Sequence, residues 1–360
     1  MIVIITTQKG ILTKMKKSSL VVLLASLAML ASCVGTSSSL SSSSEAPVEQ
    51  VVLFGVGHKA KYSIKGTVPA ATTVQTDVTF LSALFDSDGV VLDVNVDVMQ
   101  VKAAVVDATT ASITSAVNSG SDVKSKWELG EDYGMGGSAT KGEWYVQASA
   151  WENYAVGKTA AEVAAGTESD ELLASVTVTT TDFAYALTEA WHNIAVIKTT
   201  EPESLHVGLG MFSSHAALTT TVSLTGAAFL GAEVVSSTVD CFQIPYLSTN
   251  IGTVEVPVYS LTVPETGKVQ VAKKVTCIES KVELHDLYGM VGTTVIYGDW
   301  YQQAANLEAF VLGKTVAAAF TGVSETGEFT DPTIASVSIT VSDFALTYAE
   351  AYTVSQSTTR

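Results

Sequence analysis

The feature that most constrains the fold is an internal repeat. "KWELGEDYGM" from Lys126 is answered by "KVELHDLYGM" from Lys281, and "ASVTVTTTDFAYALTEAW" from Ala174 by "ASVSITVSDFALTYAEAY" from Ala335. Shorter motifs, such as "VLFGVG" with "LHVGLG" and "VGKT" with "LGKT", recur in the same order. Motifs that keep their order over half a chain indicate two copies of one structural unit.

The repeat divides the chain into segments. The chain has 360 residues, of which 47% are hydrophobic and 15% charged, so it is long enough for two domains that each bury a core. We expect five segments: a signal peptide at 1–32, a Ser-rich tether at 33–50, a first copy at 51–194, a polar linker at 195–204 and a second copy at 205–355.

Each copy is expected to contain strands followed by helices. "TFLSALFDSDGVVLDVNVDVMQ" alternates on both sides of Asp88-Gly89, which predicts a hairpin. Trp144, Ala148, Trp151 and Ala155 have the spacing of one apolar helix face, and Trp300 begins the same pattern in the second copy. The predicted fold class is α+β, as two tandem copies of one small domain with a mostly antiparallel sheet and packed helices.

Two further pairs of motifs have a structural and a functional interpretation. "GVG" and "GLG" lack the third glycine of a dinucleotide fingerprint, which favours close packing of strands over approach to a ligand. "DVMQ" from Asp97 and "DCFQ" from Asp240 offer an acid and an amide that could contact a ligand. A turn at a strand end, with its polar groups satisfied, is the favoured alternative.

The N-terminus has the pattern of an export signal. Lys14, Lys16 and Lys17 precede the apolar run "LVVLLASLAML", which leads into "LASC" ending at Cys33. The run is too short for a permanent membrane-spanning helix. "LASC" resembles the lipobox of bacterial lipoproteins, which implies a lipid on Cys33 after cleavage. The following "VGTSSSLSSSSEAP" predicts a flexible tether.

The charge balance excludes some partners. The chain has 19 basic and 36 acidic residues, and removal of 1–32 takes away four lysines and no carboxylate, which leaves 15 basic residues. An acidic protein of this kind is a poor ligand for nucleic acid, because phosphates require a basic surface. It also has no electrostatic attraction to anionic lipid, so membrane attachment would depend on the lipid at Cys33.

The sequence contains no recognised catalytic or metal-binding motif. Five histidines lie without metal-ligand spacing, and neither a phosphate-binding loop nor a nucleophile elbow is present. We therefore expect no catalytic residue, no metal and no enzyme. Cys241 and Cys277 both lie in the second copy, and two alternatives stay open for them: a disulfide or two separate thiols.

The loop in "DYGMGGSATKGEWYVQ", from Asp132 to Gln147, and its counterpart in "LYGMVGTTVIYGDWYQQ", from Leu287 to Gln303, are the candidate sites. A turn rich in Gly and hydroxyls before a helix offers backbone N–H groups to a phosphate. The structural alternative is a helix entry with core aromatic residues, in which Glu143 opposes a bound anion.

These elements together resemble the tandem FMN-binding-domain lipoproteins of Gram-positive bacteria. The resemblance rests on the lipobox, the Ser-rich tether and the repeated "ELGEDYGM", "EWYVQ", "VGKT" and "ASVTVT", and it covers nearly the whole mature chain. It implies FMN outside the cell, attached through its phosphate to a Ser or Thr hydroxyl by a flavin transferase. It also implies electron transfer from a membrane quinone pool to external acceptors, with a membrane quinone-linked dehydrogenase as partner.

The resemblance implies that FMN is attached to hydroxyls of the two loops. Relatives often have Gly-Ala-Ser or Gly-Ala-Thr after "YGM", whereas this chain has "GGSATKG" and "VGTTVIYG". Thr140 and Thr294 are the expected attachment residues, with Ser138 and Thr293 as competitors. The expected function is a lipid-anchored flavin carrier on the outer face of the cytoplasmic membrane. The alternative is a non-catalytic surface or solute-binding lipoprotein that has kept the fold without the cofactor.

Overall fold

The fold is known from a computed structural model. It describes residues 47–66, 73–254, 257–263, 277–290, 298–324, 327–329 and 337–357. These residues belong to one compact unit, Pro47–Arg360. The expected signal peptide and Cys33 lie outside the described residues.

The first half of the chain builds an antiparallel sheet on three long strands. These are β1 (Gln50–Lys65), β2 (Thr73–Phe85) and β3 (Val91–Val105). The hairpin predicted at Asp88-Gly89 is confirmed: Gly89 has a φ of +84°, and the Asp86 carboxylate accepts hydrogen bonds from two N–H groups of the turn. Short strands extend this sheet: β4 (Ala111–Ile113), β5 (Ala195–Thr199) and β11 (Cys277–Ile278).

The second half builds a separate three-stranded antiparallel sheet. Its strands are β6 (Leu205–Ala216), β7 (Thr219–Leu230) and β8 (Glu233–Pro245), in that order. A small ribbon follows, formed by β9 (Leu247–Asn250) and β10 (Tyr259–Thr262). The 3₁₀ turn η2 (Pro202–Ser204) precedes β6.

The two main sheets pack face to face. Buried residues such as Phe54 and Phe80 in the first sheet share one apolar cluster with Leu209 and Phe242 in the second. Direct bonds also cross between the sheets: the Asn95 amide donates to the Val207 carbonyl oxygen at 2.7 Å. The two halves therefore share a core that neither sheet could bury alone.

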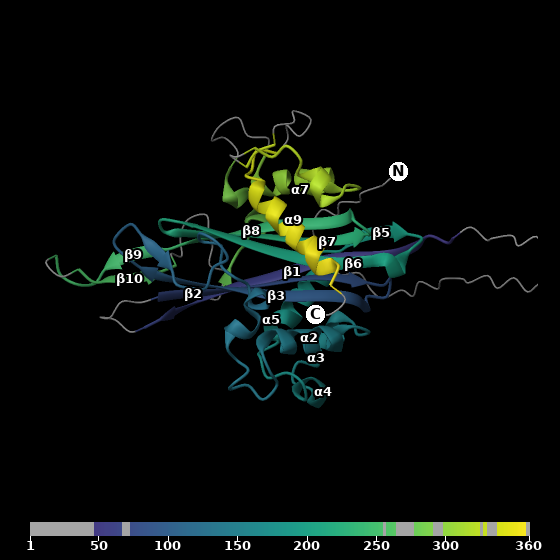
Figure 1. Cartoon of the computed structure of the whole chain (residues 1–360), viewed down its shortest axis with the longest axis horizontal. Coiled ribbons are helices and arrows are strands. Elements are labelled where there is room, and N and C mark those ends of the chain that lie inside the picture. Colours follow the sequence, from purple (N-terminus) through teal and green to yellow (C-terminus); the bar gives the residue numbers. More distant parts are fainter. Residues whose placement is uncertain are drawn as a thin grey trace, which may run out of the picture. The chain divides into compact units, whose positions relative to one another are not determined.

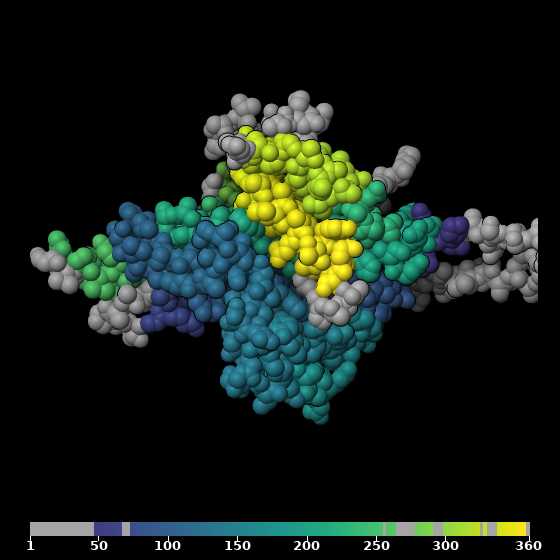
Figure 2. Space-filling view, in the orientation of Figure 1, coloured from purple at the N-terminus to yellow at the C-terminus, as the bar shows by residue number. Residues whose placement is uncertain are grey.

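Helices cover the outer face of each sheet. The first half supplies α1 (Lys126–Leu129), η1 (Gly130–Tyr133), α2 (Trp144–Ala155), α3 (Ala160–Ala165), α4 (Asp170–Leu173) and α5 (Thr181–His192). The second half supplies α6 (Lys281–Leu284), η3 (His285–Tyr288), α7 (Trp300–Val311), α8 (Val316–Ala319) and α9 (Ser342–Ser355). Each set has its own apolar cluster with its sheet, which gives four layers with the sheets in the middle (Figure 1). In Figure 2 the yellow and yellow-green atoms of the second half lie in the upper and central part of the view, and blue and teal atoms of the first half fill the lower part.

The sequence predicted local features of the helices correctly. The four expected apolar residues of α2 are buried, and Thr159 with Glu162 forms the expected capping box at α3. The glycine pairs do allow close packing, but between strand and helix: a Cβ at Gly57 would overlap the Ala186 carbonyl oxygen of α5. The same relation holds between Gly210 and Thr347 of α9.

The segment expected as a linker is partly a strand. Residues Ala195–Thr199 form β5, which pairs antiparallel with the start of β1. The architecture is thus a mixed α/β fold with antiparallel sheets and packed helices, which confirms the fold class in its coarse form. Among the described residues, none of the helices has the length and apolar composition that crossing a membrane requires.

Candidate functional site

A pocket of about 330 Å³ opens between the first sheet and its helices, beside the loop that the sequence singles out. Tyr133, Met135 and Trp144 from the two ends of that loop line one wall. Val98 of β3 and Phe183 of α5 also line the pocket, so apolar and aromatic side chains from four elements meet there.

Charged groups surround the aromatic wall. The Lys126 ammonium lies 4.9 Å from the centre of the Tyr133 ring and 5.5 Å from that of Trp144. Asp182, at the start of α5, is paired with Lys61 and with Lys59, whose ammonium lies 3.1 Å from the carboxylate. Burial alone would raise the pKa of Asp182, but the two lysines outweigh burial and hold the pKa below its ordinary value.

The loop between η1 and α2 is held by a carboxylate. Glu143 accepts hydrogen bonds from the main-chain N–H groups of Met135, at 2.8 Å, and of Gly136. Ser138 and Ala139 both donate their N–H to the Met135 carbonyl oxygen. Several main-chain N–H groups that could bind a phosphate thus donate hydrogen bonds within the loop. This supports the alternative in which the loop is only the entry to a helix.

The predicted hydroxyls fall into two groups. Ser138 and Thr140 are exposed, and the Ser138 hydroxyl donates to the carbonyl oxygen of Met135, a residue of the pocket wall, at 3.2 Å. Thr293 and Thr294 lie outside the described residues. Ser138 is therefore hydrogen-bonded to a residue that lines the pocket, whereas Thr140 lies at the surface of the same loop.

Gln147 links the end of the loop to another segment of the pocket. Its side chain is fully buried, and its amide nitrogen donates to the Gly142 carbonyl oxygen at 2.9 Å. Its carbonyl oxygen accepts from the Thr177 N–H at 2.6 Å, the Thr177 hydroxyl at 3.0 Å and the Val178 N–H at 3.1 Å. Since Thr177 and Val178 line the pocket, Gln147 fixes the pocket wall to the loop.

The second half contains a related group of side chains. The Lys281 ammonium lies 4.9 Å from the Tyr288 ring centre and 5.4 Å from that of Trp300. Gln303 makes hydrogen bonds equivalent to those of Gln147: its amide nitrogen donates to the Gly298 carbonyl oxygen, and its carbonyl oxygen accepts from Ser338 and Ile339.

The acid of this second group differs from Asp182 in its charge environment. Burial raises the pKa of Asp343, and the hydrogen bonds of Ser342 and Ser223 and the charge of Lys281 only partly offset it. In β1 Lys59 and Lys61 follow "GVG" and neutralise Asp182, whereas in β6 Phe212 and Ser214 follow "GLG".

The "DVMQ" and "DCFQ" motifs are not turns, as the favoured sequence interpretation had them. They lie inside β3 and β8, because the strands continue past them. Asp97 accepts from the Val98 N–H at 2.6 Å and the Trp127 N–H at 3.2 Å, which fastens α1 to β3. Gln100 lines the pocket, so the amide of this motif is placed where a ligand could contact it.

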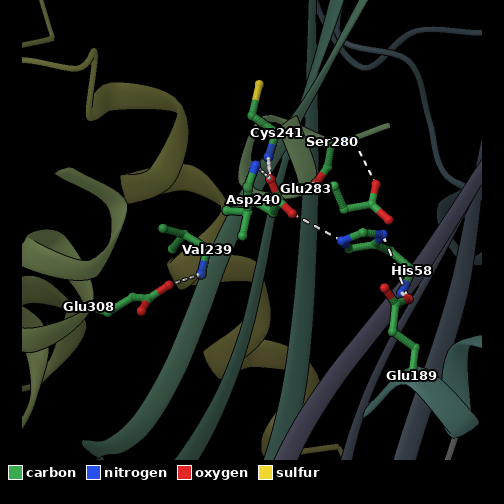
Figure 3. Close-up of polar contacts among 9 residues, drawn as sticks. His58, Glu189, Val239, Asp240, Cys241, Ser280, Glu283 and Glu308 are labelled. Carbon is green, nitrogen blue, oxygen red and sulfur yellow. Dashed lines mark hydrogen bonds and ion pairs between the residues drawn. The ribbon is translucent and has the colours of Figure 1, made fainter. Parts of the chain in front are cut away.

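A second polar cluster lies where the two halves meet. His58 of β1 is 9% exposed, and its Nε2 lies 3.0 Å from Oδ2 of Asp240 on β8. Its Nδ1 lies 3.8 Å from Oε2 of Glu189 on α5, which also accepts the His58 main-chain N–H at 2.6 Å. Glu283 of α6 lies on the Nδ1 side of the ring (Figure 3).

The carboxylates set the charge state of His58. Burial by itself lowers the pKa of an imidazole, but the hydrogen bond and charge of Asp240 and the charges of Glu189 and Glu283 raise the pKa of His58 to about 9. Burial in turn raises the pKa of Glu189. Phe242 packs edge-on against the ring, with centres 5.1 Å apart, so the cluster borders the core between the sheets.

Two other titratable groups lie near this cluster. The Cys241 thiol is buried, and burial raises its pKa. The side chain of Cys277 lies outside the described residues, so the expected alternatives for a disulfide are not decided there. Glu308 of α7 accepts the Val239 N–H at 2.8 Å, and burial raises its pKa to about 8 (Figure 3).

Sequence reasoning missed the His58 cluster because its members are far apart along the chain. The available signal was a histidine in an otherwise apolar strand, since a buried imidazole needs polar partners. Those partners come from three elements whose packing the sequence does not specify. Comparison with known proteins adds no assignment: no family model, curated protein or solved structure matches the chain.

Proposed function

We propose that this chain is a lipid-anchored extracellular flavin carrier. In this proposal Cys33 carries the lipid, a flavin transferase attaches FMN, and a membrane quinone-linked dehydrogenase supplies the electrons that pass to external acceptors. The support from the sequence is the resemblance to tandem FMN-binding-domain lipoproteins. The chain would act on the outer face of the cytoplasmic membrane as a carrier, without catalytic residues of its own.

The observation that carries the proposal is the pocket beside the loop. It combines an aromatic wall of Tyr133, Trp144 and Phe183 with the ammonium groups of Lys126 and Lys61. A flat aromatic ring system with an anionic tail requires both kinds of surface. Its volume of about 330 Å³ is near the lower end of the range for small-molecule sites.

The residues fit a covalently tethered group better than one held through its phosphate alone. Glu143 accepts the N–H groups of Met135 and Gly136, so these two groups are not available to a phosphate. Ser138 and Thr140 are exposed, as an ester-forming hydroxyl must be for an attaching enzyme to reach it. A tether also keeps the local concentration of the group high on an acidic protein that repels free anions.

When bound, FMN would supply the one- and two-electron chemistry. The chain's own residues would bind and orient it: Trp144 and Tyr133 by packing, and Lys126 by neutralising negative charge. Gln147 would keep the pocket wall in place through its hydrogen bonds to Thr177 and Val178.

We also infer that the two halves are tandem copies of one domain. Equivalent polar bonds support this: Glu152 accepts the Val96 N–H and Glu308 accepts the Val239 N–H, each at 2.8 Å. Gln147 and Gln303 form another such pair. The copies differ around Asp182 and Asp343, since only Asp182 is neutralised by lysines of β1, and this favours the first copy as the stronger flavin site.

The alternative is a non-catalytic surface or solute-binding lipoprotein without flavin. The occupation of the loop N–H groups by Glu143 favours it, because this bond stabilises the loop without any ligand. Under this alternative the aromatic residues beside the loop are core residues only.

The deciding experiment is production of the full chain in a host with a flavin transferase, followed by a denaturing gel under ultraviolet light. The proposal predicts a fluorescent band that survives denaturation and a mass increase equal to one or two FMN groups. A dark band of unmodified mass rejects the flavin proposal and leaves the alternative.

Variants then locate the attachment. Thr140→Ala should remove the signal of the first half and Thr294→Ala that of the second. Ser138→Ala and Thr293→Ala are the matched controls and should keep it. Retention of the full mass increase in the Thr140→Ala, Thr294→Ala double variant rejects these two residues, and its loss in the control pair assigns the competitors instead.

A further inference from the structure

We propose that His58, Glu189 and Glu283 bind one Zn²⁺ ion at the junction of the two halves. This inference goes beyond the flavin proposal and does not depend on it. The ligands come from β1, α5 and α6, so the ion would connect the first half to the second.

The geometry of the three side chains fits a small divalent ion. One ligand atom from each residue lies within 4.8 Å of the other two. Two ligands at tetrahedral positions around Zn²⁺ are about 3.4 Å apart, given bond lengths of about 2.1 Å. The 3.8 Å between the His58 Nδ1 and the Glu189 Oε2 already approaches that separation, and small side-chain rotations would complete the site.

Asp240 provides an independent indication of a metal-binding histidine. Its carboxylate is buried, at 3% exposed, and lies 3.0 Å from the His58 Nε2. A carboxylate that accepts the Nε2–H fixes the ring and directs the Nδ1 lone pair toward the ion, which is the usual outer-shell arrangement at metal-bound histidines. In Figure 3 Asp240 lies at one ring nitrogen, whereas Glu189 and Glu283 lie on the side of the other.

The cluster also has the charge and access that a metal ion requires. Three carboxylates surround one imidazole, so even a protonated His58 leaves an excess of negative charge for a divalent ion to neutralise. Glu283 is exposed, which gives an ion a route from solvent. One of its oxygens caps α6 by accepting the Ser280 N–H at 2.7 Å, and in this proposal the other is the ligand.

The donor set favours Zn²⁺ over Ca²⁺. An imidazole nitrogen suits zinc, whereas calcium prefers six to eight oxygen ligands. Binding replaces the Nδ1 proton of His58, which leaves to solvent as the N–Zn bond forms. Among the described residues the strand β6 offers no equivalent, because Met211 takes the place of His58 after "GLG" and its main-chain N–H donates to the Glu350 carboxylate at 2.7 Å.

The test is titration of the full chain, freed of metal by a chelator, with ZnCl₂ in a calorimeter at pH 7.5. We expect one Zn²⁺ per chain, release of about one proton (measured by repeating the titration in buffers of different ionisation enthalpy), and a higher melting temperature with Zn²⁺. CaCl₂ at the same concentration should give no such shift.

Glu283→Gln and Glu128→Gln form a matched pair of variants. Both glutamates accept the N–H of a helix-capping serine at 2.7 Å, in α6 and in α1, but only Glu283 lies beside His58. Glu283→Gln should weaken Zn²⁺ binding at least about tenfold, since even outer-shell changes cost about 10–100-fold. Glu128→Gln should leave the affinity unchanged.

Histidine variants complete the test. His58→Gln should abolish the stoichiometric binding, and His285→Gln, which alters an exposed histidine 3.3 Å from Asp286, should preserve it. The absence of stoichiometric Zn²⁺ binding to the unaltered chain overturns the proposal. So does equal affinity in the Glu283→Gln and Glu128→Gln variants, which is measurable even if His58→Gln does not fold.

Discussion

Replacement of Gln147 by leucine tests whether one buried amide holds the pocket wall to the loop. Leucine is similar in size but removes four hydrogen bonds, to Gly142, to Val178 and two to Thr177. Each such bond contributes about 1 kcal/mol, and a buried partner left without one costs about 1–3 kcal/mol. Thr177 is exposed, so water can replace part of the loss there. We expect the free energy of unfolding to fall by about 3–4 kcal/mol.

Urea unfolding followed by tryptophan fluorescence measures this change, with the midpoint and slope fitted separately. Gln303→Leu should give a similar loss, because Gln303 makes the equivalent bonds in the second half. Gln302→Leu is the matched control: Gln302 is exposed and accepts one N–H, from Asp299, so its loss should be at most about 1 kcal/mol. A loss for Gln147→Leu no larger than that of the control would refute the reasoning.

Three further predictions concern the core, the pH dependence and the pocket. Gly57→Ala should lower the free energy of unfolding in urea by about 3 kcal/mol or more, because the added Cβ overlaps a carbonyl oxygen of α5. Gly137→Ala, where the added Cβ meets open space, should leave it unchanged. Burial raises the pKa of the Glu308 carboxyl from 4.5 to about 8, so its contribution to stability is complete below pH 4.5 and is lost as the pH rises through 8. Glu308→Gln should therefore flatten the dependence of the unfolding free energy on pH between these values. An unchanged pH dependence contradicts the raised pKa. Lys61→Met should raise the pKa of Asp182, measured by carbon-detected NMR titration, and an unchanged pKa would show that Lys61 does not stabilise the carboxylate.

Local structure was predictable because it depends on short-range rules. The Asp88-Gly89 turn, the apolar face of α2 and the capping box at Thr159 each follow from residues a few positions apart, and all three are confirmed. The close approach at Gly57 was also indicated, although its partner is a helix and not a strand.

Long-range packing was not predictable from the same rules. The run "VVLFGV" in β1 is apolar on both faces, which is typical of a strand covered on both sides, but it does not say what covers it. The cover on one side is the other sheet, and on the other side it is α5. Because that packing sets the distance from His58 to Asp240, the cluster at the junction could not be read from the sequence.

The candidate flavin site stands between these two cases. Its loop, its aromatic residues and the pair Ser138 and Thr140 are contiguous in sequence, so the repeat pointed to the loop and the family resemblance to its hydroxyls. The lysines of β1 that neutralise Asp182 are more than a hundred residues away from it in the chain, and Lys61 donates a hydrogen bond to it. The chemistry of the pocket therefore depends on the same strand register that sequence patterns leave open.

The core shared by the two sheets has a consequence for the order in which the chain folds. A ribosome completes β1, β2 and β3 well before Leu205, the first residue of β6, has been made. Until then the face that carries Phe54 and Phe80 has no cover, and a growing chain with such a face is prone to aggregate. Helices of the first half can close only the opposite face. We therefore expect the growing chain to need protection, from a chaperone or from delayed collapse, until β6, β7 and β8 cover that face.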